Sequence, residues 1–263
     1  MIRVVKKFQN STFIQDLILY PKIPRLECQM DVDWREKHIL LKVAFPVSVH
    51  SPKATFEIPF GAIQRPTTRR TPEEQAKFEV PALFWADLSD GTYGVSVLND
   101  SKYGYDVRDN VIRLTLLRSP AYPDPHADEG RHRFTYAVYP HAGDWVRGGV
   151  VQRGYELNYP LIPYPTTEHS GSLPPIHTFL RMEPNTVILT ALKKAEDADA
   201  WILRFYEFGG KAAEVRIALP KPPKAAHEVN LVEREIAPLI VNEQEVIVPT
   251  KPYEIKTVKI EFR

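Results

Sequence analysis

The chain has 263 residues, a formal net charge of +1 and 43% hydrophobic residues, which is enough apolar side chain for a folded core and excludes a disordered protein. Its 34 basic and 33 acidic side chains nearly balance, so charge gives no reason to expect nucleic acid or an anionic membrane as a partner. The single cysteine excludes an intrachain disulfide and a cysteine-based zinc site. No apolar run reaches the roughly 20 residues of a membrane helix, and the N-terminus does not resemble a signal peptide. We therefore expect a cytoplasmic protein or a piece cut from a larger one.

Short strands are predicted along the first half of the chain. Apolar and polar residues alternate in residues 26–34, which is typical of a strand with one buried face. On that face Cys28 is interpreted as a small core residue rather than a nucleophile. Further strands are predicted in residues 40–49, 54–60, 93–98, 111–117 and 134–138. Because little helix separates them, and because 24 prolines interrupt the chain, this pattern favours an all-β sandwich.

A helix is predicted only in residues 144–157, with Asp144 as its N-cap, although three glycines weaken it. Five prolines between residues 160 and 175 then predict an extended connection and a domain boundary. Beyond it, short strands are predicted in residues 187–191, 201–208, 214–219, 229–232, 246–248 and 255–262. That is the content of a second, smaller β-sandwich.

Two regions are dense in polar groups. Residues 99–106 lie between apolar strands and mix tyrosines with Asn, Asp and Lys, which suits the stacking and hydrogen bonding that sugars need; a tight solvated turn is the alternative. Residues 118–132 form a proline-rich excursion whose His126, Asp128, Glu129 and His132 could bind a metal. Because their spacing matches no ligand motif, a rigid docking loop is favoured there.

Other catalytic patterns are weak or absent in the sequence. Glycoside hydrolysis needs two carboxyl groups at a defined separation, and the candidates for such a pair are Asp87, Asp90, Asp100, Asp106, Asp124 and Asp128. Sequence does not give their separation, and solvated turn positions are the alternative. No phosphate-binding glycine loop, nucleophile elbow or H-E-x-x-H motif occurs.

Several motifs together resemble the C-terminal half of the α-mannosidases of glycoside hydrolase family 38, in its cytosolic and bacterial branch. The resemblance covers nearly the whole chain. Its most specific part runs from Trp85-Ala86-Asp87-Leu88-Ser89-Asp90-Gly91 to Leu98-Asn99-Asp100-Ser101-Lys102-Tyr103-Gly104-Tyr105-Asp106. Further matches are Phe8–Asp16, Val32–Glu36, Lys42–Pro46, Arg65–Thr67, Arg113–Pro120 and Tyr155–Asn158.

The resemblance implies a fold and an activity. It implies a galactose-mutarotase-like supersandwich over residues 1–165 with one short helix, a linker over 166–183 and a small β-sandwich over 184–263. Family members are retaining, metal-dependent exo-α-mannosidases, whose zinc ligands and catalytic aspartates belong to an N-terminal domain that this chain does not resemble. We therefore assign no catalytic residue and no metal ligand here, and expect zinc in the missing catalytic domain.

The resulting hypothesis is a non-catalytic C-terminal part of an α-mannosidase, inactive alone, which helps to complete the active site. Its expected partners are α-mannosides or oligosaccharides and its own N-terminal catalytic domain, with a homo-oligomer left open. The substrate-binding candidates are Asn99, Asp100, Lys102, Tyr103, Tyr105, Asp106, Arg118, Arg131 and His132. Two alternatives stay open: a free-standing sugar-binding β-protein, and a mutarotase-like enzyme that uses a histidine and a carboxylate.

Overall fold

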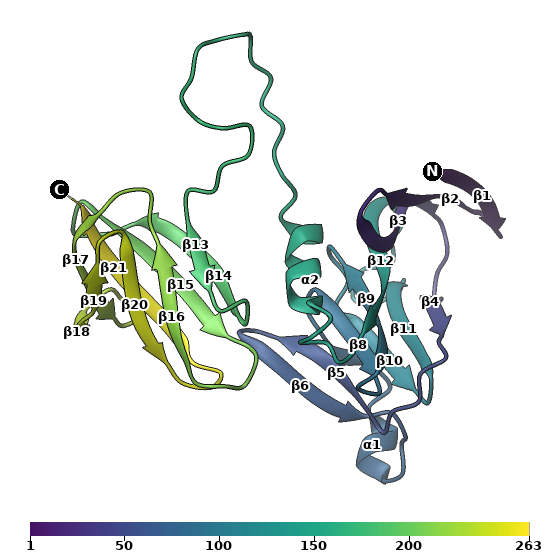
Figure 1. Cartoon of the computed structure of the whole chain (residues 1–263). Helices are drawn as coiled ribbons and strands as arrows, with labels where there is room; N and C mark the ends of the chain where they lie inside the picture. The colour runs from purple at the N-terminus through teal and green to yellow at the C-terminus, as the bar shows by residue number, and fades with distance from the viewer. Residues whose placement is uncertain (263) are drawn as a thin grey trace. The chain divides into compact units, whose positions relative to one another are not determined.

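The computed structural model describes residues 1–262 and confirms an all-β protein made of sandwiches, with two short helices (Figure 1). Every strand pairing is antiparallel. The chain divides into two compact units, Met1–Leu161 and Ile162–Arg263. We describe each unit by itself.

The first unit packs a large sheet against a small one. The large sheet has eight strands in the order β1-β2-β3-β12-β9-β8-β5-β6, with the bounds β1 Ile2–Phe8, β2 Ser11–Tyr20, β3 Ile23–Trp34, β12 Gly130–Ala142, β9 Tyr93–Asn99, β8 Trp85–Ser89, β5 Lys53–Ile58 and β6 Gly61–Pro66. The small sheet has four strands in the order β4-β11-β10-β7, with the bounds β4 Leu41–Pro46, β11 Val111–Leu117, β10 Gly104–Arg108 and β7 Val80–Pro81.

The core of this unit forms where the alternating residues of the two sheets meet. Trp34 and Phe56 from the large sheet and Tyr105 from the small one are almost completely buried in the same cluster, and the Phe56 and Tyr105 rings meet edge to face. Cys28 lies in this cluster as predicted. Burial raises the pKa of its thiol to about 11, which keeps it protonated and unreactive.

The helices differ from the sequence prediction in two ways. The described residues form two helices where one was predicted, and the predicted helix begins at Val150 and not at residue 144. α1 spans Pro72–Ala76 and begins with a capping box made by Thr71 and Glu74. α2 spans Val150–Asn158 and begins after Gly149, whose φ of 64° only glycine adopts readily. Asp144 instead caps the preceding turn, where its Oδ1 accepts from the Arg147 N–H at 2.8 Å.

The second unit is a smaller β-sandwich of two sheets. One has the order β13-β16-β20-β19 and the other β14-β15-β21-β17-β18. The bounds are β13 Arg181–Glu183, β14 Val187–Lys194, β15 Ala200–Glu207, β16 Ala213–Ala218, β17 Pro223–Val229, β18 Glu235–Pro238, β19 Ile240–Asn242, β20 Glu245–Thr250 and β21 Ile255–Phe262. Leu203, Phe205, Val248 and Ile260 are among the side chains buried between them.

The segment from Tyr159 to Leu180 contains no helix or strand, and its side chains are exposed almost throughout. Exposed backbone without ladder hydrogen bonds is the preferred site of proteolytic cleavage. We therefore expect limited proteinase K digestion to cut first in this segment and to release two fragments that stay folded. Mass spectrometry of the first products checks this, and a first cut inside residues 26–97 would contradict it. The predicted domain limits remain a prediction until that digestion is done.

Candidate functional site

The polar loop predicted in residues 99–106 connects the two sheets of the first unit. It leaves the large sheet at the end of β9 and enters the small sheet at β10. The sequence prediction made the whole stretch a loop, but residues from Gly104 onward form a strand that pairs with β7 and β11. The true loop is therefore short, with Asp100 to Tyr103 crossing the end of the sandwich.

Two of the predicted binding residues hold the loop in shape. Asn99 is 0% exposed; its Nδ2 donates to the Leu83 carbonyl at 2.8 Å and to the Tyr105 hydroxyl at 2.6 Å, and its Oδ1 accepts from the Lys102 N–H. Tyr105 is equally buried, and burial raises the pKa of its hydroxyl far above its usual range. Because neither side chain reaches the surface, we correct both from ligand contacts to supports of the loop.

Of the remaining loop residues, Asp100 and Tyr103 are exposed and Lys102 is half-buried. The Tyr103 side chain is 55% exposed. Asp100 Oδ2 accepts from the Thr135 N–H at 2.8 Å, so this carboxylate also ties the loop to β12. Lys102 places its ammonium 4.4 Å from the centroid of the Phe134 ring, a cation–π contact, and burial lowers its pKa. His132 lies at the same end of the sandwich, with Nε2 2.7 Å from the Asp128 carbonyl oxygen.

The other three candidates lie on two different faces. Asp106 and Arg118 line one open hollow beside the small sheet, where Asp106 accepts from Arg69 at 2.8 Å. Arg131 lies on the outer face of the large sheet and forms a two-point ion pair with Asp31, at 2.7 and 2.6 Å. That hydrogen bond is the main cause that lowers the pKa of Asp31 to about 2. The structure thus places Asp106 and Arg118 in a separate hollow, while Arg131 lines a hollow of the large sheet together with Asp100.

The proline-rich excursion does not gather its four possible ligands. Asp128 Oδ2 accepts from the Ser119 N–H at 2.9 Å, and His126 pairs with Glu129 at 3.0 Å. These contacts fix the loop through its own backbone and leave no shared point for a metal. Within the described part of the chain, only one group of three possible ligands lies close enough to hold an ion, and it is elsewhere.

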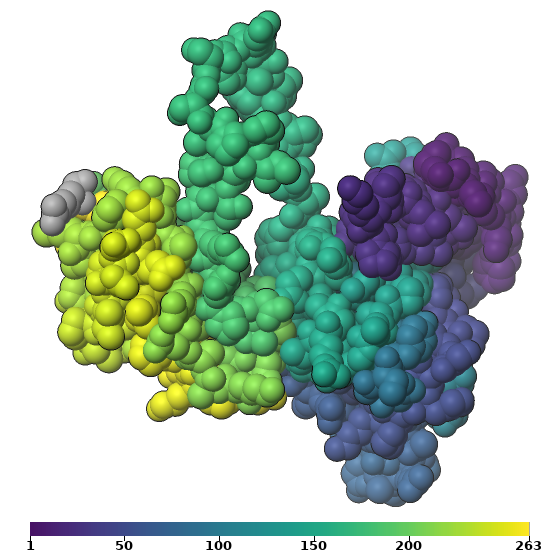
Figure 2. All heavy atoms as spheres, viewed as in Figure 1, coloured from purple at the N-terminus to yellow at the C-terminus, as the bar shows by residue number. Residues whose placement is uncertain are grey.

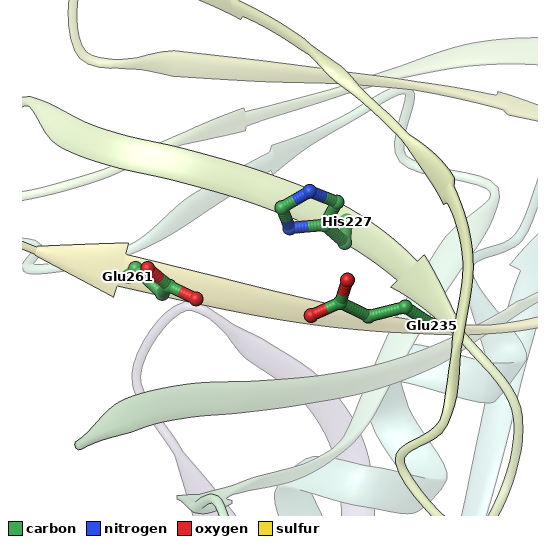
Figure 3. Close-up of side chains that lie close together, drawn as sticks. All are labelled: His227, Glu235 and Glu261. Carbon is green, nitrogen blue, oxygen red and sulfur yellow. The ribbon is translucent and has the colours of Figure 1, made fainter. Parts of the chain in front are cut away.

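That group lies on the second unit and consists of His227, Glu235 and Glu261, whose ligand atoms lie within 4.8 Å of one another (Figure 3). Sequence reasoning missed it because the three residues have no motif spacing and meet only through the pairing of β17 with β18 and β21. Lys259 reaches both carboxylates, with its Nζ 3.2 Å from Glu235 and 4.0 Å from Glu261. Since this ammonium lies beside both carboxylates and offsets one of their two charges, we interpret the group as an ion-pair cluster.

Asp87, one of the aspartates considered for a catalytic pair, belongs to a buried network. It is 0% exposed and accepts from Ser96 Oγ at 2.9 Å, while His141 Nε2 lies 2.8 Å away. The His141 ring lies against Gly94 and Gly148, at both of which an added Cβ would come within 2.4 Å of ring atoms. The network therefore has a packing role and offers no carboxylate to a substrate.

Comparison with known proteins identifies the class. The profile of the glycosyl hydrolases family 38 C-terminal domain matches residues 1–126, and that of the family 38 C-terminal beta sandwich domain matches residues 186–258. The chain therefore belongs to glycoside hydrolase family 38 and corresponds to the C-terminal domains of that family, as its motifs indicated.

Individual relatives agree with this assignment. Human alpha-mannosidase 2C1 is 39% identical over 234 residues, which are 86% of this chain and 22% of that protein. Alpha-mannosidase G of Dictyostelium discoideum is 36% identical over 252 residues, which are 94% of this chain and 23% of that protein. The crystal structure of an alpha-mannosidase from Enterococcus faecalis V583 superposes with a TM-score of 0.81 at 20% identity, over 95% of this chain and 29% of that one. The chain thus spans about a fifth of the curated relatives it matches.

No helix within residues 1–262 combines the length and the apolar character needed to cross a membrane.

Proposed function

We propose that this chain is the non-catalytic C-terminal part of a retaining α-mannosidase and that its exposed loop completes the substrate site of an N-terminal catalytic part. The observation that carries the proposal is the extent of the match: most of this chain aligns with α-mannosidases that are about four to five times as long. The cytoplasm is the proposed location, supported by the resemblance to the cytosolic branch of the family.

The proposed contact with the substrate is made by the exposed end of the sandwich. Tyr103 offers an apolar ring face, and Asp100 and Lys102 offer an acceptor and donors beside it. A ring with charged hydrogen-bonding groups suits a hydroxyl-rich ligand. Rigid strands on both sides, β9 and β10, hold these groups in place, which a binding site requires.

In this proposal the zinc and the nucleophile belong to the N-terminal catalytic part and not to this chain. The ligand cluster that the described residues do form is filled by Lys259, and the buried Asp87 is closed to substrate. The N-terminal part would supply metal and covalent chemistry, and this part would bind and orient the sugar.

Replacing Tyr103 with alanine tests the proposal in the complete gene product. We expect kcat/KM on an aryl α-mannoside to fall at least tenfold, about 1.4 kcal/mol of transition-state binding, with little change in Tm because the side chain is half in solvent. Tyr20→Ala, which replaces an exposed tyrosine at the end of β2, is the control and should change neither value. The isolated chain is expected to show no turnover. Unchanged kcat/KM in Tyr103→Ala would contradict the proposed role of the loop.

A further inference from the structure

The two sheets of the first unit differ in width, and this difference leaves part of the large sheet uncovered. The large sheet has eight strands and the small one has four, with β4 at its end. β1 and β2 lie at the margin of the unit (Figures 1 and 2), beyond the small sheet's last strand. Cross-strand partners in an antiparallel sheet share a face. Since Lys6 pairs with Phe13, and Phe13 with the buried Val32, this face of β1 looks toward the core.

The core-side face of β1 is nevertheless open to solvent. Phe8, which follows Lys6 on that face by strand alternation, is 45% exposed, and Ile2 on the same face is 66% exposed. Phe8, with Val4 and Lys6 of the same face, borders a groove of about 830 Å³ together with β4. Its apolar floor includes Val4, Phe8, Phe13, Trp34, Leu41 and Val43. A sandwich normally buries such a face against another strand.

The edge of β4 that borders this groove is also unpaired. Within the described residues β4 has one neighbour, β11, so its other side presents backbone groups to no strand. Side chains from both faces of β4, Lys42 and Val43 among them, line the groove, which therefore reaches around the strand edge. A free edge beside an apolar floor is the geometry into which an extended segment adds as a further strand.

The charge of the groove indicates which kind of polypeptide segment would bind there. Its charged lining residues are Lys6, Lys7, Lys42 and Arg113, and none is acidic. Lys42 and Arg113 pair with Glu79 and Asp106. Lys6 and Lys7 have no ion pair in the described part of the chain. An added strand would therefore place apolar side chains on the floor and carboxylates opposite these two lysines.

We propose that the groove between β1 and β4 receives an extended acidic and apolar strand from polypeptide N-terminal to this region, which pairs with the edge of β4. This inference rests on the proposed function, because both matching profiles describe C-terminal domains and the relatives carry most of their length outside the matched region. The added strand would cover the exposed face of β1 and widen the small sheet.

Hydrogen exchange of the isolated chain and of the complete gene product tests the pairing. We expect the β4 amides of Leu41 to Phe45 that face away from β11 to exchange at least tenfold more slowly in the complete product. Equal rates would overturn the proposal, as would a gene product with no polypeptide before Met1. Sedimentation of the isolated chain adds a second test, since a dimer broken by Phe8→Glu would assign the groove to a second copy instead.

Variants on opposite faces of β1 sharpen the test. Lys6→Glu and Phe8→Glu should each lower the Tm of the complete product while leaving that of the isolated chain within about 2 °C, because the groove is filled only in the complete product. Val5→Glu, 60% exposed on the outer face of the same strand, is the control and should lower neither. An equal effect of all three variants in the complete product would overturn the proposal. Full α-mannosidase activity with an unprotected β4 would reject this inference and leave the proposed function standing.

Discussion

Replacing Gly148 with alanine is expected to lower the free energy of unfolding of the first unit by about 3 kcal/mol, the upper range for forced overpacking of a core. A Cβ at this position would lie 2.4 Å from Nδ1 and 2.5 Å from Cγ of His141. The ring is buried and is held by Asp87 at 2.8 Å, so moving it breaks a buried hydrogen bond as well as its packing.

Chemical denaturation of the purified chain checks this value. Gly171→Ala is the matched control, because an added Cβ there meets no atom within 4 Å; its free energy of unfolding should change by less than about 0.5 kcal/mol. If Gly148→Ala unfolds at the same denaturant concentration as this control, the His141 ring moves freely and the buried network is not rigid.

The first unit is also expected to lose stability as the pH rises from 5 to 8, because of Glu57. Burial is the main cause that raises the pKa of this carboxyl from 4.5 to about 7, and its Oε2 accepts from the Phe84 N–H at 2.6 Å. An acid with a raised pKa in the folded state binds its proton more tightly there than when unfolded. Stability is therefore highest near and below pH 4.5. It falls by about 3 kcal/mol between pH 4.5 and about 7, where the unfolded chain releases this proton and the folded chain keeps it, and then levels off.

Glu57→Gln should remove this slope, since the amide stays neutral and its oxygen can still accept from Phe84. We expect the variant and the parent chain to have similar unfolding free energies at pH 5, and the variant to be more stable by up to about 3 kcal/mol at pH 8. Urea unfolding at a series of pH values measures the difference. Parallel curves for the two proteins would show that Glu57 does not titrate in this range.

The alternation of buried and exposed residues made much of the fold predictable. The strand expected in residues 26–34 is β3, Ile23–Trp34, because one face of it packs on the core and the other meets polar groups. The hairpin of β1 and β2 was missed. Its core-side face carries Lys6 beside Val4 and Phe8, so without a covering strand the period of two does not stand out in the sequence.

The candidate site was less predictable, because its grouping depends on which strand joins which sheet. Asn99 and Tyr105 had the composition expected of a sugar site, but the crossing from β9 to β10 buries both. Arg131 and His132 are neighbours in sequence, but strand alternation sends them to opposite faces of β12. For the exposed Tyr103, with Asp100 and Lys102 beside it, contact with a sugar stays a prediction.

The position of β12 in the large sheet has a consequence for synthesis of the chain. β3 pairs with β12 along nearly its whole length, and the Arg131–Asp31 ion pair joins residues 100 positions apart. At about 5–20 residues per second, a ribosome needs roughly 5–20 s to deliver β12 after β3 has emerged. During that interval a sheet of β1 to β3 would have two unpaired edges, at β1 and at β3, and an uncovered apolar face. Such a surface is one that chaperones bind and that drives aggregation. Folding of the first unit therefore waits for its middle strand, which is made late.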